Sequence, residues 1–158
     1  MGNEKKMDRR TMMARTTAGA AAFSVVPRHV LGGPSHTSPN DKIHVAYIGT
    51  GTQALRMMAS LVKNDQVRIT AVCDPNKDST NYVDWSADGL RNNLRRCLND
   101  EAWDEGVKGI HAGRDVAKKF LKTYYAKNGA PGKVKAYADF RDLLANESGV
   151  DVVQILTP

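Results

Sequence analysis

Apolar residues recur at two different spacings along the chain, and these spacings predict alternating strands and helices. Continuous apolar runs rich in β-branched residues, typical of buried parallel strands, occupy residues 43–48, 67–73 and 150–156, with a shorter run at 134–138. Stretches with apolar side chains three or four positions apart lie between them. This order predicts an α/β fold, a parallel sheet with flanking helices.

The helical spacing predicts four helices, each with one apolar face. Ser86 is the expected N-cap of the second helix, which should end at Trp103 and the 106–109 stretch, and Asp139 should cap the fourth. The second helix falls within a segment of about residues 75–112, which we interpret as an insertion before the next crossover helix. The apolar positions of the four helices are Leu55, Met58, Ala59 and Val62; Leu90, Leu94, Cys97 and Leu98; Val116, Phe120, Leu121 and Tyr124; and Phe140, Leu143 and Leu144.

A glycine loop separates the first expected strand from the first helix. Gly49-Thr50-Gly51-Thr52-Gln53-Ala54 fits the pattern G-x-G-x-x-A in the order strand, turn, helix that a dinucleotide fingerprint requires. Gly49 permits a tight turn, Gly51 lets a pyrophosphate approach the backbone, and Ala54 lets the helix pack closely. The first N–H groups of the helix, near Thr52 and Gln53, would then face the phosphates. The pattern predicts a Rossmann-type nucleotide site.

An acidic residue strengthens this interpretation. Asp74 ends the second strand, 23 residues after Gly51, where an acidic residue accepts hydrogen bonds from the adenosine ribose. A carboxylate there repels a 2′-phosphate, so Asp74 favours NAD over NADP. The alternative role for Asp74 is a turn before Pro75.

The N-terminal region differs from the rest of the chain in charge. The chain carries a net charge of +6, and residues 1–40 hold six basic and two acidic residues. No basic stripe with interleaved aromatic residues accompanies this charge, so we expect no nucleic-acid partner. Arg9-Arg10 before a short, mildly apolar stretch is typical of a twin-arginine (Tat) export signal, too short to span a membrane. We expect residues 1–40 to be signal and linker, the Tat translocon to be a partner during export, and the location to be periplasmic or secreted.

Two cysteines and two histidines are candidates for chemistry, and we expect structural roles for all four. Cys73 lies in an apolar strand and Cys97 on the apolar side of a helix, as small buried side chains do. Neither has Cys or His neighbours at metal-ligand spacing. His44 lies early in a strand, and His111 lies in the insertion.

Several segments together resemble secreted bacterial members of the Gfo/Idh/MocA oxidoreductase family. The resemblance covers nearly the whole chain and implies that residues 41–158 are part of an NAD(P)-binding Rossmann domain, incomplete because the family's substrate domain is absent. It implies hydride transfer at a sugar or polyol carbon, and a homo-oligomer for the full-length protein. The segments that carry it are Val26–Gly33 after the twin arginine, Ile43–Gly51, Val72–Pro75, Gly113–Asp115, Tyr137–Arg141 and Val150–Pro158.

The same resemblance implies a cofactor site but no catalytic residue. By motif match, cofactor contacts fall on Gly49, Thr50, Gly51, Gln53 and Asp74, with Leu156, Thr157 and Pro158 near the ribose or the nicotinamide approach. The family's catalytic Lys, in a Glu-Lys-Pro motif, and its downstream Asp and His would follow the fourth strand, so none can be assigned here. We therefore expect no turnover from these 158 residues alone.

Three other functions fit the same fingerprint. Some relatives in the family are glycoside hydrolases that use tightly held NAD for transient oxidation, and the chain could equally be a truncated, non-catalytic nucleotide-binding fragment. Methyltransferases also place a glycine loop and an acidic strand end in this order, but the Tat-type leader and the Thr157-Pro158 strand end favour the oxidoreductase family.

Overall fold

The computed structural model describes residues 37–38 and 41–157, and the strands in this part of the chain form one parallel sheet. The expected export signal, and the linker apart from Thr37 and Ser38, lie outside the described residues. The sheet order is β3-β2-β1-β4. The strands are β1 (Ile43–Ile48), β2 (Val67–Cys73), β3 (Lys135–Tyr137) and β4 (Val152–Ile155). The α/β fold with a Rossmann-type parallel sheet is confirmed.

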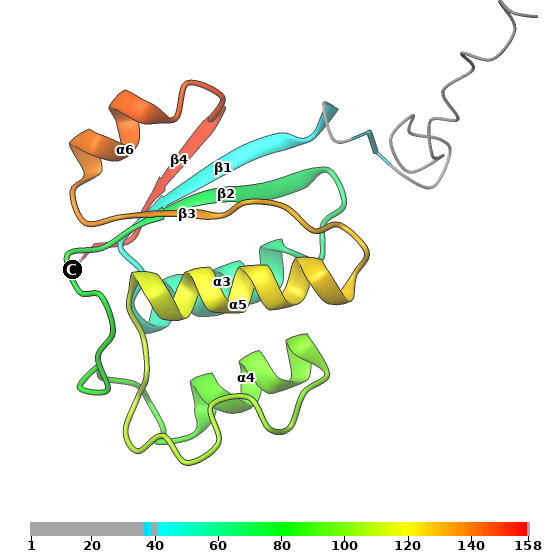
Figure 1. The fold of residues 1–158 in the computed structure, drawn as a ribbon. Helices are drawn as coiled ribbons and strands as arrows, with labels where there is room; N and C mark the ends of the chain where they lie inside the picture. The colour runs from blue at the N-terminus through cyan, green and yellow to red at the C-terminus, as the bar shows by residue number, and fades with distance from the viewer. Residues whose placement is uncertain (1–36, 39–40, 158) are drawn as a thin grey trace, which may run out of the picture.

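Helices cover both faces of this sheet. Helices α3 and α5 lie on one face and α6 on the other, as Figure 1 shows. The chain runs outward from β1 to β2 and β3, then returns to β4 on the far side of β1. Because crossover connections are right-handed, this reversal places α6 on the opposite face. The helices are α3 (Thr52–Leu61), α4 (Gly89–Leu98), α5 (Arg114–Lys127) and α6 (Phe140–Asn146).

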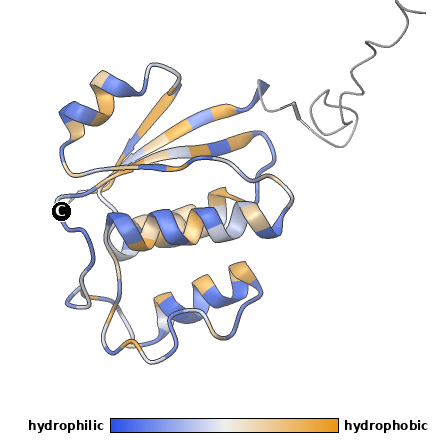
Figure 2. Ribbon diagram, in the orientation of Figure 1, coloured by the Kyte–Doolittle hydropathy of each residue, from blue (hydrophilic) through white to orange (hydrophobic). Residues whose placement is uncertain are grey.

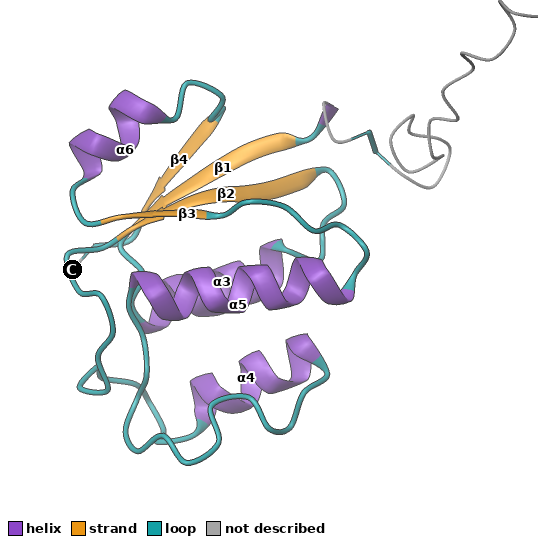
Figure 3. Ribbon diagram, viewed as in Figure 1, coloured by secondary structure: helices purple, strands orange, loops and turns teal. Residues whose placement is uncertain are grey.

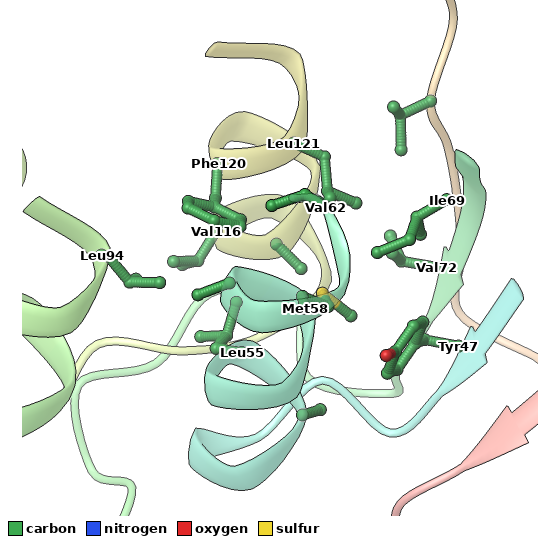
Figure 4. Packing of buried hydrophobic residues seen from close by; sticks show 14 of the residues in the cluster. Tyr47, Leu55, Met58, Val62, Ile69, Val72, Leu94, Val116, Phe120 and Leu121 are labelled. Carbon is green, nitrogen blue, oxygen red and sulfur yellow. The ribbon is translucent and has the colours of Figure 1, made fainter. Parts of the chain in front are cut away.

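The larger core lies between the sheet, α3 and α5. Tyr47, Ile69 and Val72 point from the strands towards Met58 of α3 (Figure 4). Apolar positions line the strands and recur along the helices (Figure 2). The buried apolar side chains of α3, α4 and α5 belong to this core, whereas Phe140 and Leu144 of α6, expected on its apolar face, are 45% and 54% exposed. A smaller cluster on the other face joins Ala46, Ala71 and Cys73 to Leu143 of α6.

Helix α4 forms a third layer outside α3 and α5, away from the sheet (Figure 3). Its buried residues Leu90, Leu94 and Leu98 extend the larger core. The N-cap is Asp88 rather than Ser86. The expected end at Trp103 is wrong: the helix stops at Leu98, because Asn99 adopts the left-handed conformation with φ of 48° that commonly terminates helices.

Two other expectations need adjustment. Strand β4 lies at an edge of the sheet, and Val152 and Ile155 are 47% and 65% exposed, so it is not buried on both faces as its apolar sequence suggests. Cys73 is buried, whereas Cys97 is half-buried and its thiol donates to the Ala59 carbonyl at 3.3 Å.

Asp139 caps α6 as expected, accepting a hydrogen bond from the Arg141 N–H.

The hydroxyl of Tyr47 predicts an unusual response to mutation. It is buried with no hydrogen-bond partner among the described residues, so Tyr47→Phe should leave stability at pH 7 unchanged or raise it by about 1 kcal/mol.

Burial, with a smaller contribution from Tyr125, raises the Tyr47 pKa to about 12, whereas an unfolded tyrosine titrates near 10. The native state therefore holds this proton more tightly, which stabilises it below pH 10, and the stabilisation is lost as pH rises towards 12. The variant should show a shallower alkaline loss in urea unfolding.

Tyr125→Phe is the matched control for this prediction. The Tyr125 hydroxyl accepts a hydrogen bond from the Ile69 N–H at 2.8 Å. Removing it leaves a buried donor unpaired, which should cost about 1–3 kcal/mol. An equal loss of stability in the two variants would contradict the assignment of Tyr47.

Candidate functional site

The glycine loop lies where the carboxyl ends of β1 and β4 meet. Gly49 has a φ of +89°, and its N–H donates to the Cys73 carbonyl at 2.8 Å. A Cβ on Gly49 would lie 2.7 Å from the Leu156 carbonyl carbon, and closer still to its oxygen. Gly49 therefore makes the expected tight turn, and glycine is required there by backbone conformation and by the neighbouring strand end.

Thr50 is completely buried and anchored on two sides. Its N–H and hydroxyl both donate to Oδ2 of Asp74, at 2.7 and 3.1 Å. Its carbonyl accepts from the Gly113 N–H at 3.2 Å. The loop is thus fixed to the end of β2 and to the start of α5 before any ligand binds.

Asp74 holds this arrangement together. Its Oδ1 accepts from the Asn76 N–H at 2.8 Å, and the side chain is only partly accessible, with the residue 7% exposed. A carboxylate offers about four acceptor directions, and the protein uses three of them. Asp74 lines the cavity described below, and one of its acceptor directions is not used by these three bonds. Asp74 follows the end of β2 as expected, and its bond with Asn76 is the turn contact given above as its alternative role. The sequence did not indicate its bonds to Thr50 of the glycine loop.

Arg114 secures the same strand end. Its Nη1 donates to the carbonyls of Asp74 and Pro75, at 2.9 and 2.8 Å. These contacts give Arg114 a structural role at the end of β2.

Helix α3 begins at Thr52 and presents its N-terminus to the cavity. Gly51 is the N-cap, no side chain caps the helix, and its first turn contains no acidic residue. The first-turn N–H groups, including those of Thr52 and Gln53, lack acceptors within the helix and add to the positive end of its dipole. This end of α3 can bind an anion such as a phosphate.

A cavity of about 730 Å³ opens in front of the loop, within the usual size range of ligand pockets. It lies outside the carboxyl ends of the strands, at the β1/β4 switch point where α/β sheets bind ligands. The expected residues Gly49, Gly51, Gln53 and Asp74 border it, as do Leu156 and Thr157, whereas Thr50 lies buried behind the loop. Pro158 lies outside the described residues. The remaining lining residues are Ile48, Thr52, Ala54, Cys73, Pro75, Asn76, Tyr82, Ala138, Asp139, Phe140 and Arg141.

Pro75, Asn76 and Tyr82, in the first part of the insertion, line one side of this cavity, and no residue of α4 borders it. Arg56 of α3 binds both carboxylate oxygens of Asp84 at 2.8 and 2.6 Å, and the Asp84 side chain is only 3% exposed. Thr52 donates its hydroxyl proton to the Val83 carbonyl at 3.1 Å. These contacts join segments about 30 residues apart in the sequence, so neither a motif nor a spacing signals them.

The two histidines that we expected to be structural both contact other parts of the protein. His44 contacts the Gly149 carbonyl through Nδ1 at 3.1 Å, beside β4. His111 lies between Asp104 and Asp78, at 2.6 and 2.7 Å, and joins the two ends of the insertion. Neither lines the cavity.

Neither metal-ligand clusters nor similar proteins indicate the chemistry of the described residues. Across residues 37–38 and 41–157, no cluster of three or more His, Cys, Asp or Glu side chains could hold a metal ion. No helix among these residues has the length and apolar character needed to cross a membrane. No protein-family model matches the sequence, and no curated protein is significantly similar to it.

Proposed function

We propose that the cavity at the β1/β4 switch point binds NAD, and that the chain is the nucleotide-binding part of an oxidoreductase that acts on a sugar or polyol. The observation that carries the binding proposal is the position of Gly51. Gly51 lies at an uncapped helix N-terminus, and because it is a glycine it places no Cβ at the cavity wall. A phosphate can therefore approach the first-turn N–H groups closely.

The residues at the cavity fit a dinucleotide in three ways. The N-terminus of α3 supplies N–H donors for the pyrophosphate, and Gln53 lies on the same turn. Asp74 retains one acceptor direction for a ribose hydroxyl, and its negative charge disfavours a 2′-phosphate, which supports NAD over NADP. The ends of β4 and β3 supply the remaining walls.

The reaction itself rests on the resemblance to the Gfo/Idh/MocA family. Bound NAD would accept a hydride from a substrate carbon, while the described residues bind and orient it. The Arg9-Arg10 pair, followed by a short apolar stretch, supports the proposal that the protein is exported by the Tat route to the periplasm or beyond. A glycoside hydrolase that uses NAD transiently shares the same site, and release of free sugar without net NADH by a full-length enzyme would favour it.

Gly51→Ala tests the binding proposal. The φ of Gly51 is −72°, which alanine adopts readily, and the new Cβ would lie 3.2 Å from the edge of the Tyr82 ring. The ring can shift by a few tenths of an ångström, so we expect a stability change below about 1 kcal/mol. The added methyl group would displace the Tyr82 ring at the cavity wall and crowd a phosphate at the first-turn N–H groups, so NAD affinity should fall by at least about tenfold. Calorimetric titration of the 158-residue chain with NAD and NADP measures this, and thermal melting monitors the fold.

Gly149→Ala is the matched control, because a Cβ there would meet open space and the residue lies outside the cavity. It should bind NAD as the wild type does. A folded wild-type chain that fails to bind millimolar NAD, or a Gly51→Ala variant with wild-type affinity, would refute the proposed site.

A further inference from the structure

Tyr82 belongs to the insertion and lies outside the glycine fingerprint, yet its ring lies beside Gly51 of the loop. Its Cε1 and Cδ1 atoms lie 3.2 and 3.5 Å from the position that a Cβ of Gly51 would occupy, and the side chain lines the cavity. The ring is half-buried and packs against the larger core. Tyr82 therefore stands beside the backbone that a phosphate would approach.

The backbone around Tyr82 is held in place on both sides. Asn81 forms a bridge with Ile110, and the Val83 carbonyl accepts the hydrogen bond from Thr52. Asp84, the next residue, is bound by Arg56. The ring is thus positioned by the fold, and its place over Gly51 does not depend on a ligand.

The hydroxyl of Tyr82 has a proton to donate. Its oxygen accepts a hydrogen bond from Nδ2 of Asn76 at 3.2 Å, which occupies it as an acceptor. None of the residues that the structure describes accepts the hydroxyl proton in return. Burial raises the pKa of this hydroxyl, and the charge of Asp74 acts in the same direction, while the Asn76 bond opposes them. The group therefore remains protonated at neutral pH.

We propose that Tyr82 donates a hydrogen bond to the phosphate of the nucleotide bound at Gly51, which makes the insertion part of the phosphate site. This inference rests on the proposed function. We assign a phosphate as the acceptor, rather than the base or ribose, because the edge of the Tyr82 ring lies beside the position that a Cβ of Gly51 would occupy, at the N-terminus of α3. A tyrosine hydroxyl and the first-turn N–H groups then approach one anion from two sides.

Tyr82→Phe tests this proposal, because it removes the hydroxyl and keeps the ring over Gly51. We expect the Kd for NAD and for ADP to rise about tenfold, since a hydrogen bond to a charged group is lost. The Kd for adenosine, which has no phosphate, should stay unchanged, as should the melting temperature. Titration calorimetry with NAD and ADP, and ligand-observed NMR with adenosine, provide the three values on the 158-residue chain. Tyr124→Phe is the control, because Tyr124 lies on α5 and outside this cavity.

The possible outcomes separate this inference from the proposed function. Wild-type binding of NAD with an unchanged Kd in Tyr82→Phe would overturn the role of Tyr82 and leave the NAD site intact. An equal loss for adenosine and ADP would show that Tyr82 acts on the nucleoside and overturn the phosphate assignment. A wild-type chain that binds neither NAD nor ADP would overturn both proposals. A loss confined to the phosphate-bearing ligands supports the inference.

Discussion

Gly49→Ala should destabilise the protein by about 3 kcal/mol or more, because it combines two separate costs. The first is backbone strain, since an alanine at a φ of +89° costs about 1–2 kcal/mol. The second is a collision of the new Cβ with the Leu156 carbonyl, which a side-chain rotation cannot relieve because the contact is with backbone. The Leu156 N–H donates to the Ile48 carbonyl at 2.8 Å, so relief of the collision would weaken the pairing of β1 with β4. Urea unfolding followed by circular dichroism measures the loss.

Gly129→Ala is the control for Gly49→Ala, because it measures the cost of backbone strain without a collision. Gly129 also has a positive φ, +67°, but a Cβ there meets nothing within 4 Å. It should cost only the strain, about 1–2 kcal/mol. If the two variants lose equal stability, the close approach of β4 to the glycine loop does not constrain Gly49, contrary to the fold described above.

Asp74→Ala should lower both stability and nucleotide affinity. Three donors lose their acceptor together, namely the N–H and hydroxyl of Thr50 and the N–H of Asn76. Thr50 is completely buried, so water cannot easily replace the carboxylate, and we expect a loss of about 2–4 kcal/mol. The loop then loses its attachment to β2, and NAD binding should weaken more than the loss of one ribose contact would cause. Unfolding curves and NAD titration of the same preparation measure both effects.

Asp139→Ala is the matched control for the stability effect. Asp139 also borders the cavity, but its side chain accepts one backbone hydrogen bond, from the Arg141 N–H, as the cap of α6. Its replacement should cost about 1 kcal/mol. A cost for Asp74→Ala no greater than this would show that Asp74 does not organise the loop.

Local patterns predicted much of the fold, because each strand or helix had its own periodic signal. The bounds of β1 and β2 match the apolar runs at 43–48 and 67–73. The end of α4 was missed, because Trp103 is buried as expected of a helical core residue but lies beyond a left-handed Asn99. That turn depends on a single backbone conformation, which the apolar spacing does not encode.

Only the part of the candidate site that lies in one short motif could be predicted from the sequence. The glycine loop and Asp74 follow from their order along the chain, and the structure brings them within hydrogen-bond distance. The wall formed by Tyr82, and the Arg56–Asp84 pair that anchors it, depend on contacts between distant segments. An insertion has no fixed place relative to a motif until the fold is known, so the sequence gives no signal for either.

Amide chemical shifts recorded during titration of the 158-residue chain with NAD test the central claim most directly, because they locate the ligand as well as detect it. We predict saturable shifts that are largest at the amides of Gly51, Thr52 and Gln53, with smaller ones at Asp74 and Leu156 around the same cavity. NADP should produce the same pattern only at higher concentration. Saturable shifts centred elsewhere in the described residues, or none at millimolar NAD, would contradict a dinucleotide site at the glycine loop.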